Sequence, residues 1–453
     1  MFSVILPVYN AENSIKNTIQ NIIREFIFEE DELIIVNDGS TDGTEEVLSE
    51  YIYAKQVKII NKINEGVSTA RNVGMANTSE SSKYITFVDD SDTLSNGYFQ
   101  KCYEFFNKHK HIKLAVSPII ISENGLYRDH NLNYRFKYEN SIVDIMKKIN
   151  FIHYHIGGTI FNKKFLEEHN YKFDEKLNYW EDAKFINEII LDVRKYGLIK
   201  DASYFYNRNK RDSLSHRSWK NEDRYTNHIK NNYFELIEKS KKLYGKNLNY
   251  IQYLLANHYV EFLREQNQDK INLEKVVLDS YFEIESIHLF EHIDNKIINM
   301  LPVSPRIKSI LLWFKADALD YNSNYKDISV YIHNFSLKSR KIKFSFSEES
   351  YGINIDALVL IRESQSQHNK ANNIGYKATY ILGEEIKDFS ENMYSIKLPF
   401  KYMIKDFEFQ IIDEENKLIT YVKSKSIIKR IFNRKIVSKF KNMNSYRNIT
   451  GKV

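Results

Sequence analysis

The sequence predicts an α/β protein with a doubly wound, mainly parallel sheet in its N-terminal part, a helical linker region, and a C-terminal antiparallel β-sandwich-like domain. Over the first hundred residues, short apolar β-rich runs alternate with runs of helical periodicity. This alternation is typical of strand–helix–strand units with right-handed crossovers. Beyond residue 302, alternating runs flank short polar turns, which indicates antiparallel hairpins.

Four strands separated by helices are expected near the N-terminus. The strands are expected at Phe2–Val8, Glu32–Val36, Val57–Ile60 and Lys83–Val88. Apolar residues at helical spacing predict helices at Ile15–Ile23 and Val67–Ala76, and a further helix begins after Asp42.

A polar cluster follows each of these strands. The clusters are Pro7-Val8-Tyr9-Asn10, Asn37-Asp38-Gly39-Ser40, Asn64-Glu65-Gly66 and Asp89-Asp90-Ser91-Asp92. Any one of them could be ordinary turn or helix-cap chemistry. Because open α/β sheets bind ligands at the carboxyl ends of their strands, four clusters in register predict one ligand-binding crevice.

The last cluster predicts a site for a divalent metal ion. Asp89, Asp90 and Asp92 place three carboxylates within four residues, and like charges repel unless a cation or hydrogen-bond donors lie among them. Carboxylate oxygens suit Mn²⁺ or Mg²⁺, which also bind phosphate oxygens. The sequence contains no GxxxxGK[ST] and no GxGxxG after the first strand, which argues against kinases and dehydrogenases.

The motifs resemble, in order and spacing, those of family 2 glycosyltransferases of GT-A fold over roughly residues 1–220. They read SVILPVYN from Ser3, VNDGSTD from Val36, NEGVSTARNVG from Asn64 and FVDDSD from Phe87. The resemblance implies a UDP-sugar donor. The residues that inherit nucleotide binding are Pro7, Val8, Tyr9, Asp38, Asn64 and Arg71.

The metal motif departs from the family pattern. Many members read Asp-x-Asp-Asp, whereas this chain reads Asp89-Asp90-Ser91-Asp92. We expect Asp90 and Asp92 to hold the Mn²⁺ or Mg²⁺ ion and Asp89 to face the ribose.

Two acidic residues, Glu181 and Asp182, are the candidate catalytic residues. Taken alone, they are an acidic first helical turn that complements the helix dipole. In the family, a Glu-Asp pair at a helix start follows the metal motif, and its Asp is the catalytic base, which Asp182 matches. A carboxylate in a partly closed crevice can accept the proton of an acceptor hydroxyl. A metal-neutralised diphosphate leaves without a separate general acid, so one in-line displacement with inversion suffices. A second carboxylate that acts as nucleophile would be the retaining alternative, and the resemblance favours inversion.

The segment from Tyr204 to Arg217 combines basic residues, hydroxyls and a histidine. Taken alone, it is a solvated surface loop. In the family, the corresponding segment folds over the diphosphate as a lid. The resemblance therefore makes Arg208, Ser213 and Ser215 candidate donor-binding residues, and His216 a candidate metal ligand.

Length and composition limit the possible number of domains and the cellular compartment. A chain of 453 residues is too long for one ordinary core. Its single cysteine, Cys102, permits no intrachain disulfide. The N-terminus does not resemble a signal peptide, and the apolar stretches fall short of the roughly 20 residues that a membrane span needs. We expect a cytoplasmic protein.

Four segments are expected along the chain. They are a catalytic domain at 1–220, a helical linker region at 221–301, a β-rich accessory domain at 302–422 and a basic tail at 423–453. Two hairpins are expected in the β-rich domain, at Ile328–Ile332 with Ile342–Phe346 and at Phe407–Ile411 with Leu418–Val422. Its sequence contains no clustered carboxylates and no metal-ligand spacing, so we assign this domain to acceptor binding or homo-oligomerisation. The layout resembles that of some wall teichoic acid glycosyltransferases, as an analogy of architecture.

The tail concentrates positive charge. From Tyr421 to Val453 it holds ten Lys or Arg residues and no Asp or Glu, against a net charge of +5 for the whole chain. Apolar residues recur among them at helical spacing, which is typical of helices that contact a membrane surface or an anionic polymer. A helix docked on its own protein fits the pattern equally well. No nucleic-acid recognition fold accompanies the charge.

Together these features predict an inverting, metal-dependent hexosyltransferase. We expect it to move a hexose or N-acetylhexosamine from a UDP-sugar to a hydroxyl of a cell-surface glycopolymer such as wall teichoic acid, in the cytoplasm and peripheral to the inner face of the membrane. A capsule, a lipid-linked oligosaccharide or a protein side chain as acceptor, or a binding module without turnover, are the alternatives.

Overall fold

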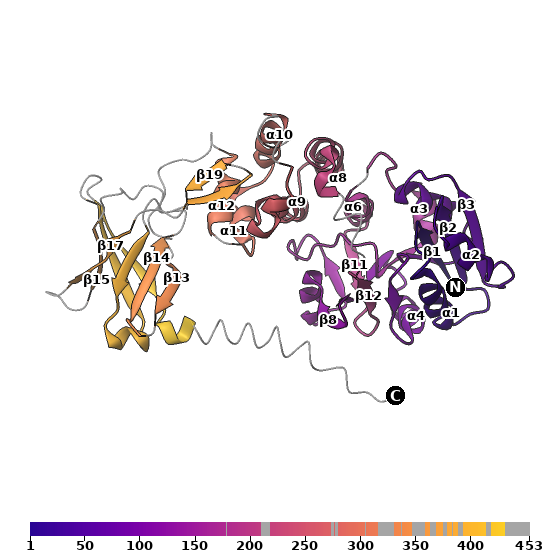
Figure 1. Ribbon diagram of the computed structural model, residues 1–453, viewed down its shortest axis with the longest axis horizontal. Coiled ribbons are helices and arrows are strands. Elements are labelled where there is room, and N and C mark those ends of the chain that lie inside the picture. The colour runs from indigo at the N-terminus through magenta and orange to yellow at the C-terminus, as the bar shows by residue number, and fades with distance from the viewer. Residues whose placement is uncertain are drawn as a thin grey trace. The chain divides into compact units, whose positions relative to one another are not determined.

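The computed structural model describes residues 1–177, 179–209, 218–272, 276, 280–303, 305–315, 330–336, 338–346, 358–362, 368–374, 378–382, 384–387, 393–413 and 418–430. The chain divides into two compact units, Met1–Leu255 and Ala256–Val453 (Figure 1). The segment boundaries expected from the sequence at residues 220, 301 and 422 stay predictions.

The first unit contains a mixed eight-stranded sheet with strand order β3-β2-β1-β4-β10-β6-β11-β9. Its strands are β1 (Phe2–Val8), β2 (Glu32–Asp38), β3 (Val57–Lys62), β4 (Tyr84–Phe87), β6 (Leu114–Val116), β9 (Ile142–Asp144), β10 (Thr159–Asn162) and β11 (Lys195–Leu198). The first four strands along the chain run parallel to one another, as predicted. Strand β10 runs antiparallel to both β4 and β6, so the sheet is mixed beyond that point.

A second sheet of four strands has the order β5-β12-β7-β8. Its members are β5 (Thr93–Leu94), β7 (Ile119–Glu123), β8 (Leu126–Asp129) and β12 (Tyr204–Asn207). The helices of this unit are α1 (Ile15–Arg24), α2 (Thr44–Ser49), α3 (Val67–Ala76), α4 (Tyr98–Lys108), α5 (Lys163–Glu168), α6 (Glu181–Val193) and α8 (Phe234–Tyr244). Helix α9 (Asn249–Leu263) contains the point at which the chain divides.

The central strands form because their residues are apolar on both faces. All seven residues of β1 are buried, as expected for a parallel strand covered on two sides. Helix α3 packs closely on this strand, since a Cβ on Gly74 would lie 2.3 Å from a side-chain carbon of Ile5. Predicted and observed bounds agree for β1 and α3. Strand β2 runs two residues further than predicted, to Asp38.

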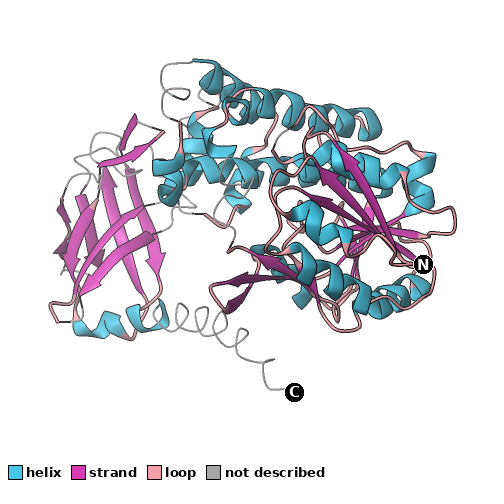
Figure 2. Ribbon diagram, turned by 45° about the vertical axis from the view of Figure 1, so that its right-hand side comes forward, coloured by secondary structure: helices cyan, strands magenta, loops and turns pink. Residues whose placement is uncertain are grey.

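The second unit ends in two antiparallel sheets that share one core (Figure 2). One has the order β13-β14-β20-β17 and the other β16-β15-β21-β22. The strands are β13 (Val330–Ser336), β14 (Lys341–Phe346), β15 (Leu358–Arg362), β16 (His368–Lys370), β17 (Asn372–Asn373), β20 (Tyr394–Lys397), β21 (Phe407–Asp413) and β22 (Leu418–Ser424). The rings of Phe344 and Phe409, one from each sheet, lie 4.5 Å apart. The predicted sandwich and both predicted hairpins are confirmed.

The remaining elements of this unit are mainly helical. They include α10 (Ser280–Glu291), α11 (Asn295–Met300), α12 (Pro305–Trp313) and a two-stranded sheet of β18 (Ala378–Ile381) and β19 (Glu384–Lys387). Within the described ranges, no helix is long and apolar enough to cross a membrane. Most of the predicted basic tail, from residue 431 onward, lies outside the described residues.

Candidate active site

The loops that follow β1 and β2 are joined to each other by hydrogen bonds. The backbone amide of Asn10 donates to Ser40 Oγ at 3.0 Å, and the amide of Thr41 donates to Asn10 Oδ1 at 2.8 Å. The amide of Ala11 donates to Thr44 Oγ1 at 2.8 Å. These contacts bring the first two polar clusters together at one edge of the sheet, as the sequence predicted.

Asp38 connects this edge to the next strand and helix. Its carboxylate lies 2.6 Å from Lys62 Nζ and accepts hydrogen bonds from the amides of Glu65 and Gly66 at 3.1 and 2.9 Å. The residue is 4% exposed. Asn64, in the loop that follows β3, is exposed, and its backbone nitrogen lies against Gly39, where a Cβ would be 2.7 Å away. The second and third polar clusters therefore also meet.

The candidate nucleotide-binding residues of β1 differ in accessibility. Pro7 and Val8 are buried strand residues, whereas Tyr9 is one of the exposed large side chains. Of these three, Tyr9 is the one whose ring can reach a ligand from the loop.

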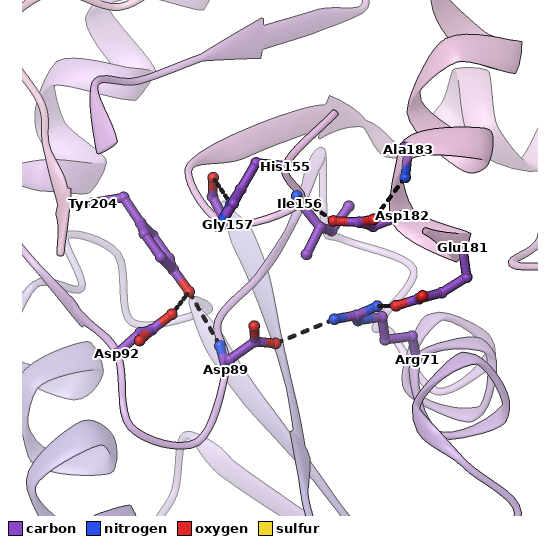
Figure 3. A network of polar contacts seen from close by, with 10 residues as sticks. All are labelled: Arg71, Asp89, Asp92, His155, Ile156, Gly157, Glu181, Asp182, Ala183 and Tyr204. Atoms are coloured by element: carbon purple, nitrogen blue, oxygen red, sulfur yellow. Dashed lines mark hydrogen bonds and ion pairs between the residues drawn. The ribbon is translucent and has the colours of Figure 1, made fainter. Parts of the chain in front are cut away.

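The carboxylates after β4 lie in different environments. Asp92 is 1% exposed, and its two oxygens accept hydrogen bonds from the Tyr204 hydroxyl at 2.6 Å and from the Asn207 amide at 2.8 Å (Figure 3). Burial raises the pKa of Asp92 well above its ordinary value, and the charge of Asp89 raises it further. Asp89 and Asp90 are partly exposed. Asp92 thus fastens this loop to β12, and Asp89 and Asp90 are left as the accessible pair.

Arg71 of α3 lies between two carboxylates that come from distant parts of the chain. One terminal nitrogen donates to Glu181 Oε1 at 2.8 Å and the other to Asp89 Oδ1 at 3.2 Å (Figure 3). The guanidinium lies 5.3 Å from the centre of the Phe173 ring, and the residue is 4% exposed. Buried charges require such pairing, so Arg71 connects the loop after β4 to the start of α6.

Asp182 occupies the first turn of α6. Its oxygens accept hydrogen bonds from its neighbour's amide, Ala183 N, at 2.7 Å and from Ile156 N at 3.3 Å. Burial raises the pKa of Asp182 to about 7; the charge of Glu181 raises it as well, while Arg71 opposes the shift. A carboxylate whose pKa lies near neutral pH is well matched to general-base catalysis. Trp180, the residue directly before Glu181, has a φ of 63°. This backbone conformation is strained for a residue other than glycine, and such strain clusters at functional sites.

Two residues that sequence reasoning did not single out belong to this network. Tyr204 links Asp92 to the loop after β4, because its oxygen also accepts a hydrogen bond from Asp89 N at 3.2 Å. His155 lies beside the same tyrosine ring and directs Nδ1 toward the Gly157 carbonyl at 3.2 Å. His155 had no local signal, since the loop at residues 151–158 follows no helical or strand period. Tyr204 was noted only as the first residue of the predicted lid segment, and its bond to Asp92 joins positions 112 apart in the sequence.

The predicted lid is only partly covered by the structure. Arg208 is exposed, and its amide donates to Ser122 O at 2.9 Å. Ser213, Ser215 and His216 lie outside the described residues. Over the described part of the chain, no group of three or more His, Cys, Asp or Glu side chains is arranged to hold a metal ion.

Comparison with known families matches residues 3–169 to the model of glycosyl transferase family 2. The minor teichoic acid biosynthesis protein GgaA of Bacillus subtilis (strain 168) is 29% identical, over 96% of this chain and all of that protein. The minor teichoic acid biosynthesis protein GgaB of the same organism is 40% identical, over 45% of this chain and 23% of that protein.

Solved structures extend the likeness to the fold. TarS 1–349 of S. aureus, in complex with UDP-GlcNAc, superposes with a TM-score of 0.54 at 19% identity, covering 70% of this chain and 87% of that one. A longer TarS structure covers 93% of this chain and 77% of that one, with a TM-score of 0.53 at 15% identity. The fold class predicted from the sequence is confirmed by these matches.

Proposed function

We propose that the protein transfers a sugar from a UDP-sugar to a hydroxyl group of wall teichoic acid, because its residues 3–169 match the model of glycosyl transferase family 2. The observation that carries the proposal is the position of Asp182, a carboxylate with a pKa of about 7 that Glu181 and Arg71 connect to the donor-side loop. The choice of polymer follows from GgaA, a protein of teichoic acid biosynthesis that aligns over nearly the whole chain. The choice of donor follows from TarS, which has been solved with UDP-GlcNAc.

The reaction that this arrangement supports is one displacement. The acceptor hydroxyl oxygen forms a bond to the anomeric carbon while the bond from that carbon to the diphosphate oxygen breaks. The electron pair leaves with UDP, and the hydroxyl proton passes to Asp182. Attack opposite the leaving group inverts the anomeric centre, as expected from the family resemblance. One positioned general base typically raises the reaction rate by a factor of about 10²–10⁴.

A divalent cation fits the donor side through two carboxylates. Asp89 and Asp90 are partly exposed at the end of β4, and one or two carboxylates together with substrate phosphates make an ordinary Mg²⁺ site. Asp92 is less accessible to an ion, because it is buried and each of its oxygens already accepts a protein hydrogen bond. We therefore propose Asp89 and Asp90 as the residues that hold Mn²⁺ or Mg²⁺. When bound, the ion would neutralise the leaving diphosphate.

The nucleotide is proposed to lie across the carboxyl ends of β1 and β2. The exposed ring of Tyr9 can stack on the uracil, and Asn64 borders the same edge. Asp38 is already paired with Lys62 and two backbone amides, so its part in nucleotide binding is to hold the loops of this edge in place. Arg71 supports the nucleotide side in the same indirect way, through Asp89.

Peripheral membrane contact is a further part of the proposal. The segment from 423 to 453 carries ten basic and no acidic residues. The charge suits either anionic lipid or the anionic polymer acceptor. We propose that it keeps the enzyme near its acceptor and that the β-sandwich contributes to acceptor binding or self-association.

The test is a transfer assay with the full chain. UDP-GlcNAc, UDP-GalNAc and UDP-glucose are offered with Mn²⁺ and purified wall teichoic acid, and incorporation of labelled sugar into polymer is measured. The proposal requires incorporation with at least one donor, and its loss in Asp182→Asn. Transfer to capsule, lipid-linked oligosaccharide or protein but not to teichoic acid would reject the acceptor. Donor binding without transfer to any of these would reject the enzyme in favour of a binding module.

A further inference from the structure

The loop at residues 151–158 places an imidazole at the site where the proposed reaction needs the sugar. Resting on the proposed function, we infer that His155 binds a hydroxyl of the transferred sugar through Nε2 and so helps to select which sugar is transferred. Its backbone neighbour Ile156 donates to the base Asp182, and the charge of Asp89 acts on the ring from the donor side. Figure 3 shows the side chain between Tyr204 and the Ile156–Asp182 contact, across from Asp89.

The ring is held on several sides. Nδ1 faces the carbonyl oxygen of Gly157 at 3.2 Å, and because a carbonyl only accepts, Nδ1 carries a proton. The His155 carbonyl accepts a hydrogen bond from Thr159 Oγ1 at 2.9 Å. Aromatic rings of His130 and Tyr206 pack on the imidazole at 5.7 and 5.1 Å between ring centres. A side chain fixed in this way loses little entropy when it binds a ligand.

Nε2 is the ring atom that remains for a ligand. None of the hydrogen bonds between described residues uses it. The residue is half-buried rather than enclosed. A sugar hydroxyl can both donate and accept, so it can pair with this nitrogen.

Glycine at 157 is part of the same arrangement. A Cβ there would lie 2.5 Å from the Tyr204 ring and 2.9 Å from His155 Cε1. The absence of a side chain at Gly157 lets both the imidazole and the Tyr204 ring approach the backbone at this position. Tyr204 is in turn fixed by Asp92 at 2.6 Å, which ties the imidazole to the loop that holds the donor-side carboxylates.

The experiment compares substitutions that keep or remove a polar atom at the Nε2 position. His155→Gln extends an amide to that position, whereas His155→Asn reaches only as far as Nδ1. His169→Ala, which removes an exposed histidine after α5, is the matched control. For each variant, kcat/KM is measured with the accepted UDP-sugar and with a series of its monodeoxy analogues, and affinity for UDP alone is measured by calorimetry.

Wild type should lose about tenfold in kcat/KM with one deoxy analogue, the order expected for one hydrogen bond to a neutral group. For His155→Asn, kcat/KM with the full sugar should be about tenfold below that of wild type. With that deoxy analogue, kcat/KM of this variant should fall no further. His155→Gln and His169→Ala should keep the discrimination, and UDP affinity should stay unchanged throughout. If His155→Asn discriminates against every analogue as wild type does, or loses UDP affinity in parallel with activity, the inference is wrong. A wild-type protein that transfers no sugar would instead refute the proposed function.

Discussion

Arg71 and Glu181 are 110 positions apart in the sequence and 2.8 Å apart in the structure, as a buried ion pair at the centre of the site. The same guanidinium also reaches Asp89 at 3.2 Å. One cation therefore holds the loop that follows β4 against the first turn of α6. This arrangement explains why Glu181 is better placed to position Asp182 than to take part in the chemistry itself.

We first predict that the ion pair is required for stability. Glu181→Gln should destabilise the protein by about 3 kcal/mol, because removal of one partner leaves a buried charge with less compensation. Asp89 still faces the guanidinium, so the loss of stability should fall at the lower end of the range for buried pairs. Urea unfolding measures this change in the free energy of unfolding. Glu50→Gln breaks an exposed pair with Lys16 and should leave the free energy of unfolding nearly unchanged. Equal effects of the two substitutions would contradict a structural role for the buried pair.

The second prediction concerns the metal ion. UDP binding followed by calorimetry should depend on Mn²⁺ or Mg²⁺ and disappear in chelator. Asp89→Asn and Asp90→Asn should weaken the metal-dependent part of this affinity. Asp92→Asn should mainly lower thermal stability, since the native carboxylate bonds Tyr204 and Asn207. Unchanged UDP affinity in chelator would remove the metal from the account.

The third prediction is a pH dependence with a defined sign. The pKa of Asp182 is raised to about 7, and only its ionised form can accept a proton. Below pH 7 the transfer rate should therefore fall about tenfold per pH unit, and above pH 7 it should level off. Arg71→Met removes a charge that lowers this pKa, so the fall should begin at a higher pH. A flat profile from pH 5 to 8 in wild type would argue against Asp182 as the base.

The fourth prediction concerns the basic tail. Ile427 is 2% exposed in the sandwich core, and the amide of Ser426 donates to Asp406 at 2.8 Å. A truncation should therefore end after Arg430 and not after Val422. This shorter protein should bind anionic vesicles and acidic polymer more weakly while its UDP-sugar hydrolysis stays near normal. Added salt should weaken the same contact in the full chain. Failure of the truncated protein to fold would show instead that the tail is docked on its own protein.

The parts of the fold that were predictable from sequence are those with a strong period. The buried run of β1 and the helical spacing of α3 determined both elements to the residue. Strand β2 extends past its apolar run because its last two residues pair with residues of the neighbouring strand β3. The Asn37 side chain donates a hydrogen bond to the Asn61 side chain, and Asp38 pairs with Lys62. From the sequence alone, two polar residues after an apolar run predict a turn, because the strand with which they pair is not yet known.

The site was predictable in its parts and not in its connections. The motifs identified Asp89, Asp182 and Arg71, but the pairing of Arg71 with Glu181 joins residues too distant for any local pattern to show. The sequence also could not indicate which of the clustered carboxylates is buried. Asp92 resembles its neighbour Asp90 in the sequence, yet the fold encloses it against Tyr204. His155 was missed because a single histidine in an irregular loop has no periodic signal.

The most direct test of the central claim is the kinetics of Asp182→Asn, which keeps the size of the side chain but cannot take a proton. We predict that kcat falls by about 10²–10⁴ while affinity for the UDP-sugar changes little, because the proposed donor contacts lie at Tyr9, Asp89 and Asp90. Full transfer activity in this variant would contradict the account and remove Asp182 from the mechanism.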